Sequence, residues 1–160
     1  MIILYRVDDR LIHGQVVEAW IPSLGIEQAI VISDEIAKDG LRQRLLRFAM
    51  PSELKLIISN VKDAPDELRR LEKEEKNTMA IMPSLREAIS ISKAGISIGR
   101  LNIGGTIYTA CRNLFDDTAV FLNDEEKNDL VSLSEQGVKL DCRAVPTDDP
   151  LDLLALASKK

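Results

Sequence analysis

The chain contains a single histidine, His13, and the side chains around it are of types that serve phosphoryl transfer. The surrounding run, residues 6–16, reads RVDDRLIHGQV and holds two aspartates and two arginines. An imidazole is largely neutral and nucleophilic at neutral pH, since its ordinary pKa is about 6.5. Guanidinium groups match the geometry of a phosphate. This run is therefore a candidate site at which a histidine accepts a phosphoryl group.

The neighbours of His13 suggest individual roles. Arg10 is close enough in sequence to reach an anion carried by the imidazole. Asp8 or Asp9 could accept a hydrogen bond from one ring nitrogen and so orient the other, and the sequence leaves both open. Gly14 leads into a helix, whose first N–H groups and dipole favour an anion. The structural alternative is a polar loop histidine, with the acids paired to the nearby arginines.

Apolar runs alternate with helical patterns along the whole chain, which positions this loop. Strands are expected over residues 1–7, 29–32, 54–59, 79–82, 96–103, 119–122 and 138–145. The alternation predicts a three-layer α/β/α fold with an open, mostly parallel sheet of about six or seven strands. The last run alternates in polarity, which favours an antiparallel strand at the sheet edge. The loop over residues 8–14 follows the first strand, and functional groups collect at the carboxyl ends of such strands.

Helices are expected between the strands. One runs through Trp20 to a stop at Gly25, and others cover residues 63–75, 84–94, 124–136 and 150–158. Another begins after a cap at Asp39 and has Leu41, Leu45 and Phe48 on one face, which we expect to pack inward. Residues 104–117 are the least regular and are expected to form a loop or a broken hairpin. With no linker or repeat, the pattern predicts one domain spanning residues 1–160.

Composition excludes several classes of function. The net charge of −5 is unlike the basic surface that nucleic-acid binding requires. Cys111 and Cys142 are far apart, and with one histidine they do not make an ordinary zinc site. No phosphate-binding G-x-x-x-x-G-K-[ST] loop is present, and we expect neither metal nor cofactor. Without a signal peptide or a long apolar run, the expected location is the cytoplasm.

Two other protein classes fit less well. The acid pair Asp8 and Asp9 is typical of the magnesium site in response-regulator receiver domains, but Ser59 and Asn60 stand where that fold needs an acceptor aspartate. A serine hydrolase would need a G-x-S-x-G nucleophile elbow, which the sequence lacks.

Residues 6–16 closely resemble the active-site loop of the IIB components in the mannose/fructose/sorbose family of the bacterial phosphotransferase system. The similarity extends through VISDEIAKD at residues 31–39, AMP at 49–51, LNIGG at 101–105 and the segment 133–146. It covers nearly the whole chain, and the first motif is the most specific. The chain departs from the family at Thr106 and Ile107, where Met-His is common.

The resemblance implies that His13 is the catalytic residue, a phosphohistidine formed through Nδ1. It would take the phosphoryl group from a histidine of a IIA component and pass it to a sugar entering through the membrane components IIC and IID. The resemblance assigns phosphate binding to Arg10 and Arg42, with Gly14 and Gln15 in the same loop. It also implies a cytoplasmic protein held at the membrane transporter.

Two points stay open at this stage. The same loop could serve a regulatory module that accepts phosphate without sugar transport, and the sequence does not specify the sugar. IIB proteins of this family can form homo-oligomers, but no exposed apolar stripe in the sequence identifies an interface.

Overall fold

Aliphatic strands that are buried on both faces build the centre of the molecule. The structure is a computed structural model, and it describes residues 1–105, 113–114 and 121–149. Every residue of β2 and β4 is buried, as expected for interior strands of a parallel sheet covered by helices. The six strands of the main sheet are β1 (Ile2–Asp8), β2 (Gln28–Ile32), β3 (Lys55–Ser59), β4 (Thr78–Met82), β5 (Arg100–Gly105) and β8 (Lys139–Cys142).

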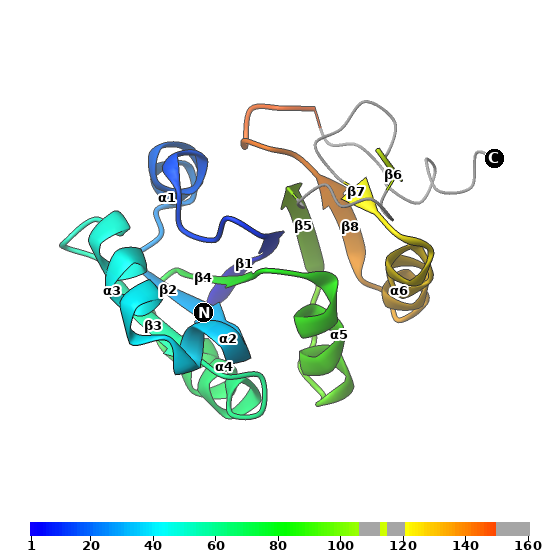
Figure 1. Cartoon of the computed structure of the whole chain (residues 1–160), viewed down its shortest axis with the longest axis horizontal. Helices are drawn as coiled ribbons and strands as arrows, with labels where there is room; N and C mark the ends of the chain where they lie inside the picture. The colour runs from blue at the N-terminus through cyan, green and yellow to red at the C-terminus, as the bar shows by residue number, and fades with distance from the viewer. Residues whose placement is uncertain (106–112, 115–120, 150–160) are drawn as a thin grey trace.

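The strand order is β3-β2-β4-β1-β5-β8, and all neighbouring pairs are parallel. From β1 the chain first builds one side of the sheet, with β2, β3 and β4. It then crosses over β1 and builds the other side, with β5 and β8. Because such crossovers are right-handed, the two directions of travel place helices on opposite faces. The carboxyl ends of β1, β5 and β8 consequently lie side by side at one edge (Figure 1).

Helices cover both faces, so the expected three-layer arrangement is confirmed. One face carries η1 (Val16–Trp20), α1 (Ile21–Leu24), α2 (Asp34–Lys38) and α3 (Gly40–Ala49). The other face carries α4 (Ala64–Glu72), α5 (Leu85–Lys93) and α6 (Asp124–Glu135). Each face has its own core, and β1 contributes to both because its side chains alternate: Leu4 packs on the first, Tyr5 and Val7 on the second.

The expected antiparallel edge strand is wrong. β8 is an edge strand of the sheet, but it pairs with β5 in parallel, with Leu101 opposite Leu140. The reason is that α6 returns the chain to the end of the sheet where β5 began, so that the next strand runs in the same direction.

The strand expected over residues 119–122 is described only as β7 (Phe121–Leu122). It pairs antiparallel with β6 (Asn113–Leu114) in a separate two-stranded sheet, so it does not extend the main sheet. Thr106, Ile107 and Cys111, together with the helix expected over residues 150–158, lie outside the described residues.

The helix termini follow the sequence signals. The side chain of Asp39 accepts hydrogen bonds from the first N–H groups of α3. Asn123 forms a reciprocal capping box with Glu126 at the start of α6. Gly137, just after α6, takes the left-handed conformation with φ of 86°. Among the described helices, none is long and apolar enough to cross a membrane.

The expected inward packing of α3 is wrong. Leu41, Leu45 and Phe48 are 62%, 60% and 91% exposed, and α3 has no buried residue. The face turned toward the protein instead carries Gln43 and Leu46, and Leu46 packs against the first core. Gln43 donates from Nε2 to the carbonyls of Ile36 and Ala37 at 3.0 and 2.9 Å, and Arg47 donates to the carbonyl of Leu56 at 2.9 Å. Together with Leu46, these polar anchors fix the rotation of the helix.

Candidate functional site

The end of β1 brings two charged side chains together inside the protein. Residues two apart in a strand point to the same face, so Arg6 and Asp8 lie side by side. Both are fully buried, and Nη2 of Arg6 donates to Oδ2 of Asp8 at 2.8 Å. A buried pair of this kind is stable only when most of its remaining polar atoms find partners. The loop after β1 supplies donors to Asp8, while Nε of Arg6 is buried and has no hydrogen-bond partner within the described residues.

The loop after β1 turns sharply to present His13. Leu11 donates its N–H to the carbonyl of Asp8 at 3.0 Å and has a left-handed backbone with φ of 56°. This conformation costs a residue with a Cβ roughly 1–2 kcal/mol. Leu11 and Ile12 are buried in the core that includes Trp20, and this burial offsets the cost. The chain then emerges at the surface at His13, just before η1.

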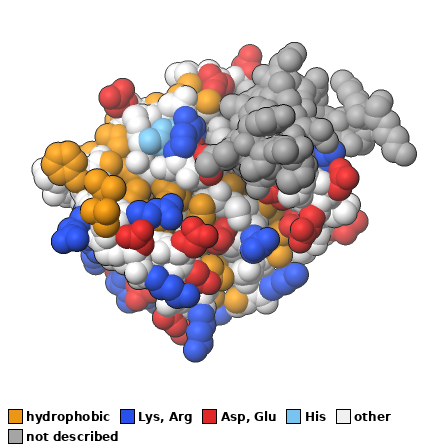
Figure 2. Space-filling view, viewed as in Figure 1, with side chains coloured by type: hydrophobic (Ala, Val, Ile, Leu, Met, Phe, Trp, Pro, Cys, Tyr) orange, Lys and Arg blue, Asp and Glu red, His pale blue; other side chains and the backbone are white. Residues whose placement is uncertain are grey.

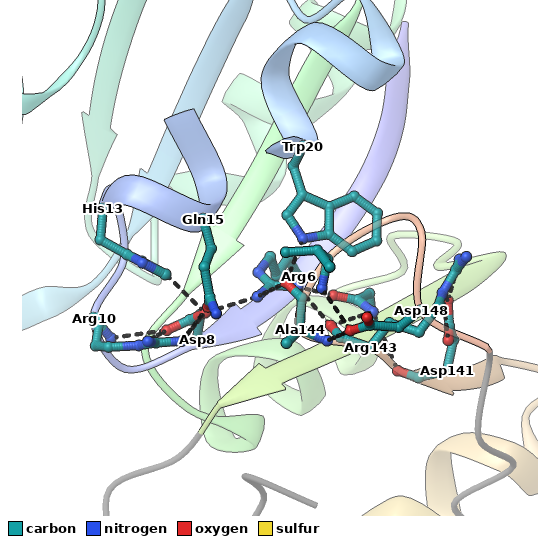
Figure 3. Close-up of polar contacts among 12 residues, drawn as sticks. Arg6, Asp8, Arg10, His13, Gln15, Trp20, Asp141, Arg143, Ala144 and Asp148 are labelled. Atoms are coloured by element: carbon teal, nitrogen blue, oxygen red, sulfur yellow. Dashed lines mark hydrogen bonds and ion pairs between the residues drawn. The ribbon is translucent and has the colours of Figure 1, made fainter. Parts of the chain in front are cut away.

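The imidazole of His13 is held by one carboxylate. Its Nε2 lies 3.0 Å from Oδ2 of Asp8, and its side chain is 17% exposed (Figure 3). Because a carboxylate only accepts, the proton must be on Nε2, which leaves the lone pair on Nδ1. The sequence left open which acid contacts the ring. The structure places Asp8 there, whereas the backbone N–H of Asp9 donates to the carbonyl of Gly105 at 3.3 Å.

Asp8 stays ionised although it is buried. Burial by itself would raise the pKa of its carboxyl, but hydrogen bonds from His13 and Arg10 and the charge of Arg6 together hold that pKa well below its usual range. Burial also lowers the pKa of the Arg6 guanidinium, and Asp8 opposes that shift. The site is therefore a fixed carboxylate surrounded by donors.

Arg10 and Gln15 complete the exposed rim of the site. Arg10 donates from Nε and Nη2 to the two oxygens of Asp8 at 3.1 and 3.2 Å, and from Nη2 to Oε1 of Gln15 at 2.9 Å. Its side chain is still 47% exposed, so it can meet an anion brought to the surface. Gly14 is exposed beside His13, with open space where a Cβ would stand.

Arg6 reaches across the end of the sheet to the turn after β8. Its Nη1 donates to Oδ1 of Asn102 and to the carbonyl of Arg143, the latter at 3.1 Å. Its Nη2 donates to the carbonyl of Ala144 at 3.2 Å. Gly104 makes room for it, because a Cβ there would stand 1.8 Å from Nη2 of Arg6. The sequence offered Arg6 as a pairing partner for the acids of the loop, and the structure confirms that it pairs with Asp8. Its reach to the turn after β8 was not predicted.

The only tryptophan of the chain holds the same turn. Nε1 of Trp20 donates to the carbonyl of Ala144 at 2.9 Å. Its ring packs against two guanidiniums, at 5.1 Å from Arg6 and 5.6 Å from Arg143 (Figure 3). Asp141 in turn holds Arg143, with 2.7 Å from its Oδ2 to Nη2. No local sequence signal assigned Trp20 or Arg143 to this cluster.

Arg42 lies apart from this cluster of contacts. It is about half exposed, and its Nη1 is 3.4 Å from Oε2 of Glu35. It lines a surface groove of about 320 Å³ together with Arg10 from the His13 loop. The structure thus brings Asp8, Arg10 and Gln15 into direct contact with one another or with His13, and it places Arg42 on a groove that reaches the same loop.

The described part of the chain contains no cluster of three histidine, cysteine or acidic side chains suited to holding a metal ion. The arrangement supplies a nucleophilic nitrogen, an ionised carboxylate that orients it, and an exposed guanidinium. Such a set can hold and transfer an anionic group.

A family model described as the PTS system sorbose subfamily IIB component matches residues 2–160. The chain belongs to this family. It is a IIB component, a phosphoryl carrier of a sugar phosphotransferase system, in agreement with the resemblance seen in the sequence.

Individual relatives are similar over nearly their whole length. The sorbose-specific EIIB component of Lacticaseibacillus casei is 35% identical, over 97% of this chain and 94% of the relative. The fructose-specific EIIB component of Bacillus subtilis (strain 168) is 30% identical over the same shares. The crystal structure of the IIBSor domain of the sorbose permease from Klebsiella pneumoniae has a TM-score of 0.92 at 28% identity, covering 100% of this chain and 98% of that one.

Proposed function

We propose that His13 is the phosphoryl-carrying residue of this IIB component and that it reacts through Nδ1. The hydrogen bond between Nε2 of His13 and Oδ2 of Asp8, at 3.0 Å, carries the proposal. It occupies one ring nitrogen and leaves the other with its lone pair. The carboxylate also stabilises the positive charge that the imidazole acquires while the new P–N bond forms.

The step balances without any further reactant. The Nδ1 lone pair attacks the phosphorus of a phosphohistidine on the donor, the new P–N bond forms, and the P–N bond of the donor breaks. In the second step a sugar hydroxyl attacks the same phosphorus, the P–N bond to His13 breaks, and the imidazole leaves in its neutral form. The proton of the hydroxyl passes to solvent water. Phosphoryl transfer of this kind depends mainly on positioning and electrostatics.

Arg10 is the residue best placed to stabilise the transferred group. It lies on the same loop as His13, is fixed by Asp8 and Gln15, and keeps an exposed guanidinium. Gly14 adds an open backbone beside the ring. We assign Arg42 a secondary part, because it lines the groove next to the loop and is not bound to the site itself.

We further propose that the donor is a IIA component and that the acceptor is a sugar carried by the membrane components IIC and IID. The mannose-specific EIIAB component of Escherichia coli (strain K12), 28% identical, supports the first part, since its name joins IIA and IIB. The match covers 98% of this chain and 48% of that relative. Sugar specificity is left to the other components.

The test is intact-mass spectrometry after incubation with phosphoenolpyruvate, the general phosphotransferase proteins and a matching IIA component. We expect a gain of one phosphoryl group that is lost in acid and is absent in His13→Ala. His13 is near the surface, so circular dichroism should show that the variant keeps its fold. A gain of a phosphoryl group by His13→Ala would refute the proposal. So would the absence of such a gain in the unchanged chain when the IIA component is shown to be phosphorylated.

A further inference from the structure

Helix α3 carries an apolar stripe that the fold leaves outside the core. The stripe consists of Leu41, Leu45 and Phe48, which are 62%, 60% and 91% exposed. Figure 2 shows apolar side chains gathered at the left of the molecule, where α3 lies in Figure 1. Single exposed apolar residues are ordinary, but three at helical spacing on one face mark a surface that another molecule covers.

The stripe is continuous with the His13 loop. The groove of about 320 Å³ is lined on one side by Leu45 and Leu46 of α3 and on the other by Leu11 and Ile12 of the loop. His13 follows Ile12 directly in the chain. A protein that brings a phosphoryl group to His13 would therefore meet α3 in the same encounter.

The charge on α3 indicates what kind of surface would fit. The helix carries three arginines over residues 40–49 and no acidic side chain, in a chain whose net charge is −5. Arg42 pairs with Glu35, and Arg47 is bound to the carbonyl of Leu56. Arg44 is exposed and makes no ion pair within the described residues. An apolar stripe with basic flanks complements an apolar knob with an acidic rim.

The size of the stripe favours a short-lived complex. Stable interfaces occupy roughly 20–30 residues on each side, far more than three apolar side chains and a groove. A second copy of this chain would also bring the arginines of two α3 helices together, and like charges disfavour that pairing. A relay protein that must be released after each transfer fits both the small apolar area and the charge.

We propose that the apolar stripe of α3, with Arg44 at its flank, is the docking surface for the phosphoryl-donor protein. This inference rests on the proposed function, because it takes His13 as the acceptor. The donor presents apolar side chains within an acidic rim, seats them on Leu45 and Phe48, and so brings its phosphohistidine to the His13 loop.

The experiment compares a protein donor with a small one. Phosphoramidate can phosphorylate an accessible histidine and needs no docking surface, whereas a phosphorylated IIA component does. The variants are Leu45→Ser, Phe48→Ser and Arg44→Glu, all at exposed positions of α3. The matched control is Val131→Ser on α6, which is 43% exposed and lies on the opposite face of the sheet.

With the IIA component, we expect kcat/KM to fall about tenfold or more for Leu45→Ser and Phe48→Ser, through a higher KM, as for loss of interface anchors. Arg44→Glu should lower kcat/KM mainly at low salt, where exposed charges are least screened. Val131→Ser should transfer normally. With phosphoramidate, all four variants should be labelled at the rate of the unchanged chain.

Several outcomes would overturn the docking surface. One is an unchanged kcat/KM for phosphoryl transfer from the IIA component to the α3 variants. Another is a kcat/KM that falls as much in Val131→Ser as in the α3 variants. Loss of transfer only to the sugar would assign the stripe to the membrane components. A dimer in sedimentation that Phe48→Ser dissolves would assign it to a second copy. Failure of the unchanged chain with both donors would instead refute His13 as the acceptor, which is a separate result.

Discussion

Nε2 of His13 lies 3.0 Å from Oδ2 of Asp8, and this contact determines which ring nitrogen is free to react. The carboxylate is fully buried and also accepts from Arg6 and Arg10. It therefore cannot turn away from the ring without breaking its ion pairs with two guanidiniums. A rigid, ionised acceptor thus fixes both the tautomer and the orientation of the imidazole.

The first prediction concerns the reactive nitrogen and the role of Asp8. In the phosphorylated chain, nitrogen–phosphorus NMR couplings should place the phosphoryl group on Nδ1. Asp8→Asn should slow phosphorylation roughly 10- to 100-fold, as is usual when the partner that orients a histidine is lost. Phosphate found on Nε2 in the unchanged chain would contradict the orientation that we infer.

The second prediction concerns acid stability. The folded state lowers the pKa of the Asp8 carboxyl. Below about pH 4, this carboxyl therefore binds a proton more readily in the unfolded chain than in the folded one. The stabilisation is present above the unfolded pKa and is lost as the pH falls toward the folded one. Urea unfolding across this range should show a smaller pH slope for Asp8→Asn. At neutral pH that variant should lose about 3–5 kcal/mol, because buried Arg6 loses its carboxylate partner.

Asp141→Asn is the control for that acid titration. Asp141 also binds an arginine, Arg143, at the sheet edge, but it does not contact His13. Equal slopes for the unchanged chain and Asp8→Asn would show that Asp8 is not the carboxyl responsible.

The third prediction tests the packing of Arg6 against Gly104. A Cβ on residue 104 would overlap the guanidinium, so Gly104→Ala should lower the free energy of unfolding by about 1–3 kcal/mol and displace Arg6. Gly99→Ala is the matched control, since a Cβ there meets nothing within 4 Å and its φ is not positive. That change should stay within about 0.5 kcal/mol.

Trp20 gives this third experiment a local readout. Its ring contacts Arg6 and it is the only tryptophan of the chain, so its fluorescence should change in Gly104→Ala and stay constant in Gly99→Ala. Identical stability and fluorescence in the two variants would mean that Arg6 can move aside without cost.

The fourth prediction separates the two arginines. Arg10→Ala should slow phosphorylation of His13 by both a IIA component and phosphoramidate, roughly 10²-fold or more, as is typical when a group that stabilises transferred charge is removed. Arg42→Ala should have a smaller effect, because Arg42 pairs with Glu35 and makes no bond to Asp8 or Gln15. Equal rates for the unchanged chain and both variants would remove the arginines from the mechanism.

The sequence by itself located the candidate site and most of the fold. The residue types of the His13 loop are local chemistry, and they lie within one short run. The period of apolar residues and the caps at Asp39 and Asn123 depend on neighbours in the chain, so the α/β alternation and several helix ends were predictable. The strand order was not predicted.

The tertiary structure decided which of these residues meet. Trp20 and Ala144 are 124 residues apart in sequence, and Arg6 and Asn102 are 96 apart, so no local pattern could join them to the site. The choice of Asp8 over Asp9 depended on where β1 ends, because Asp8 is the last residue of the strand and lies beside Arg6, whereas Asp9 belongs to the turn that follows. The outward stripe of α3 and the parallel β8 likewise followed from polar anchors and the α6 crossover, because periodicity shows that a helix or strand has two faces but not which one the rest of the protein will cover.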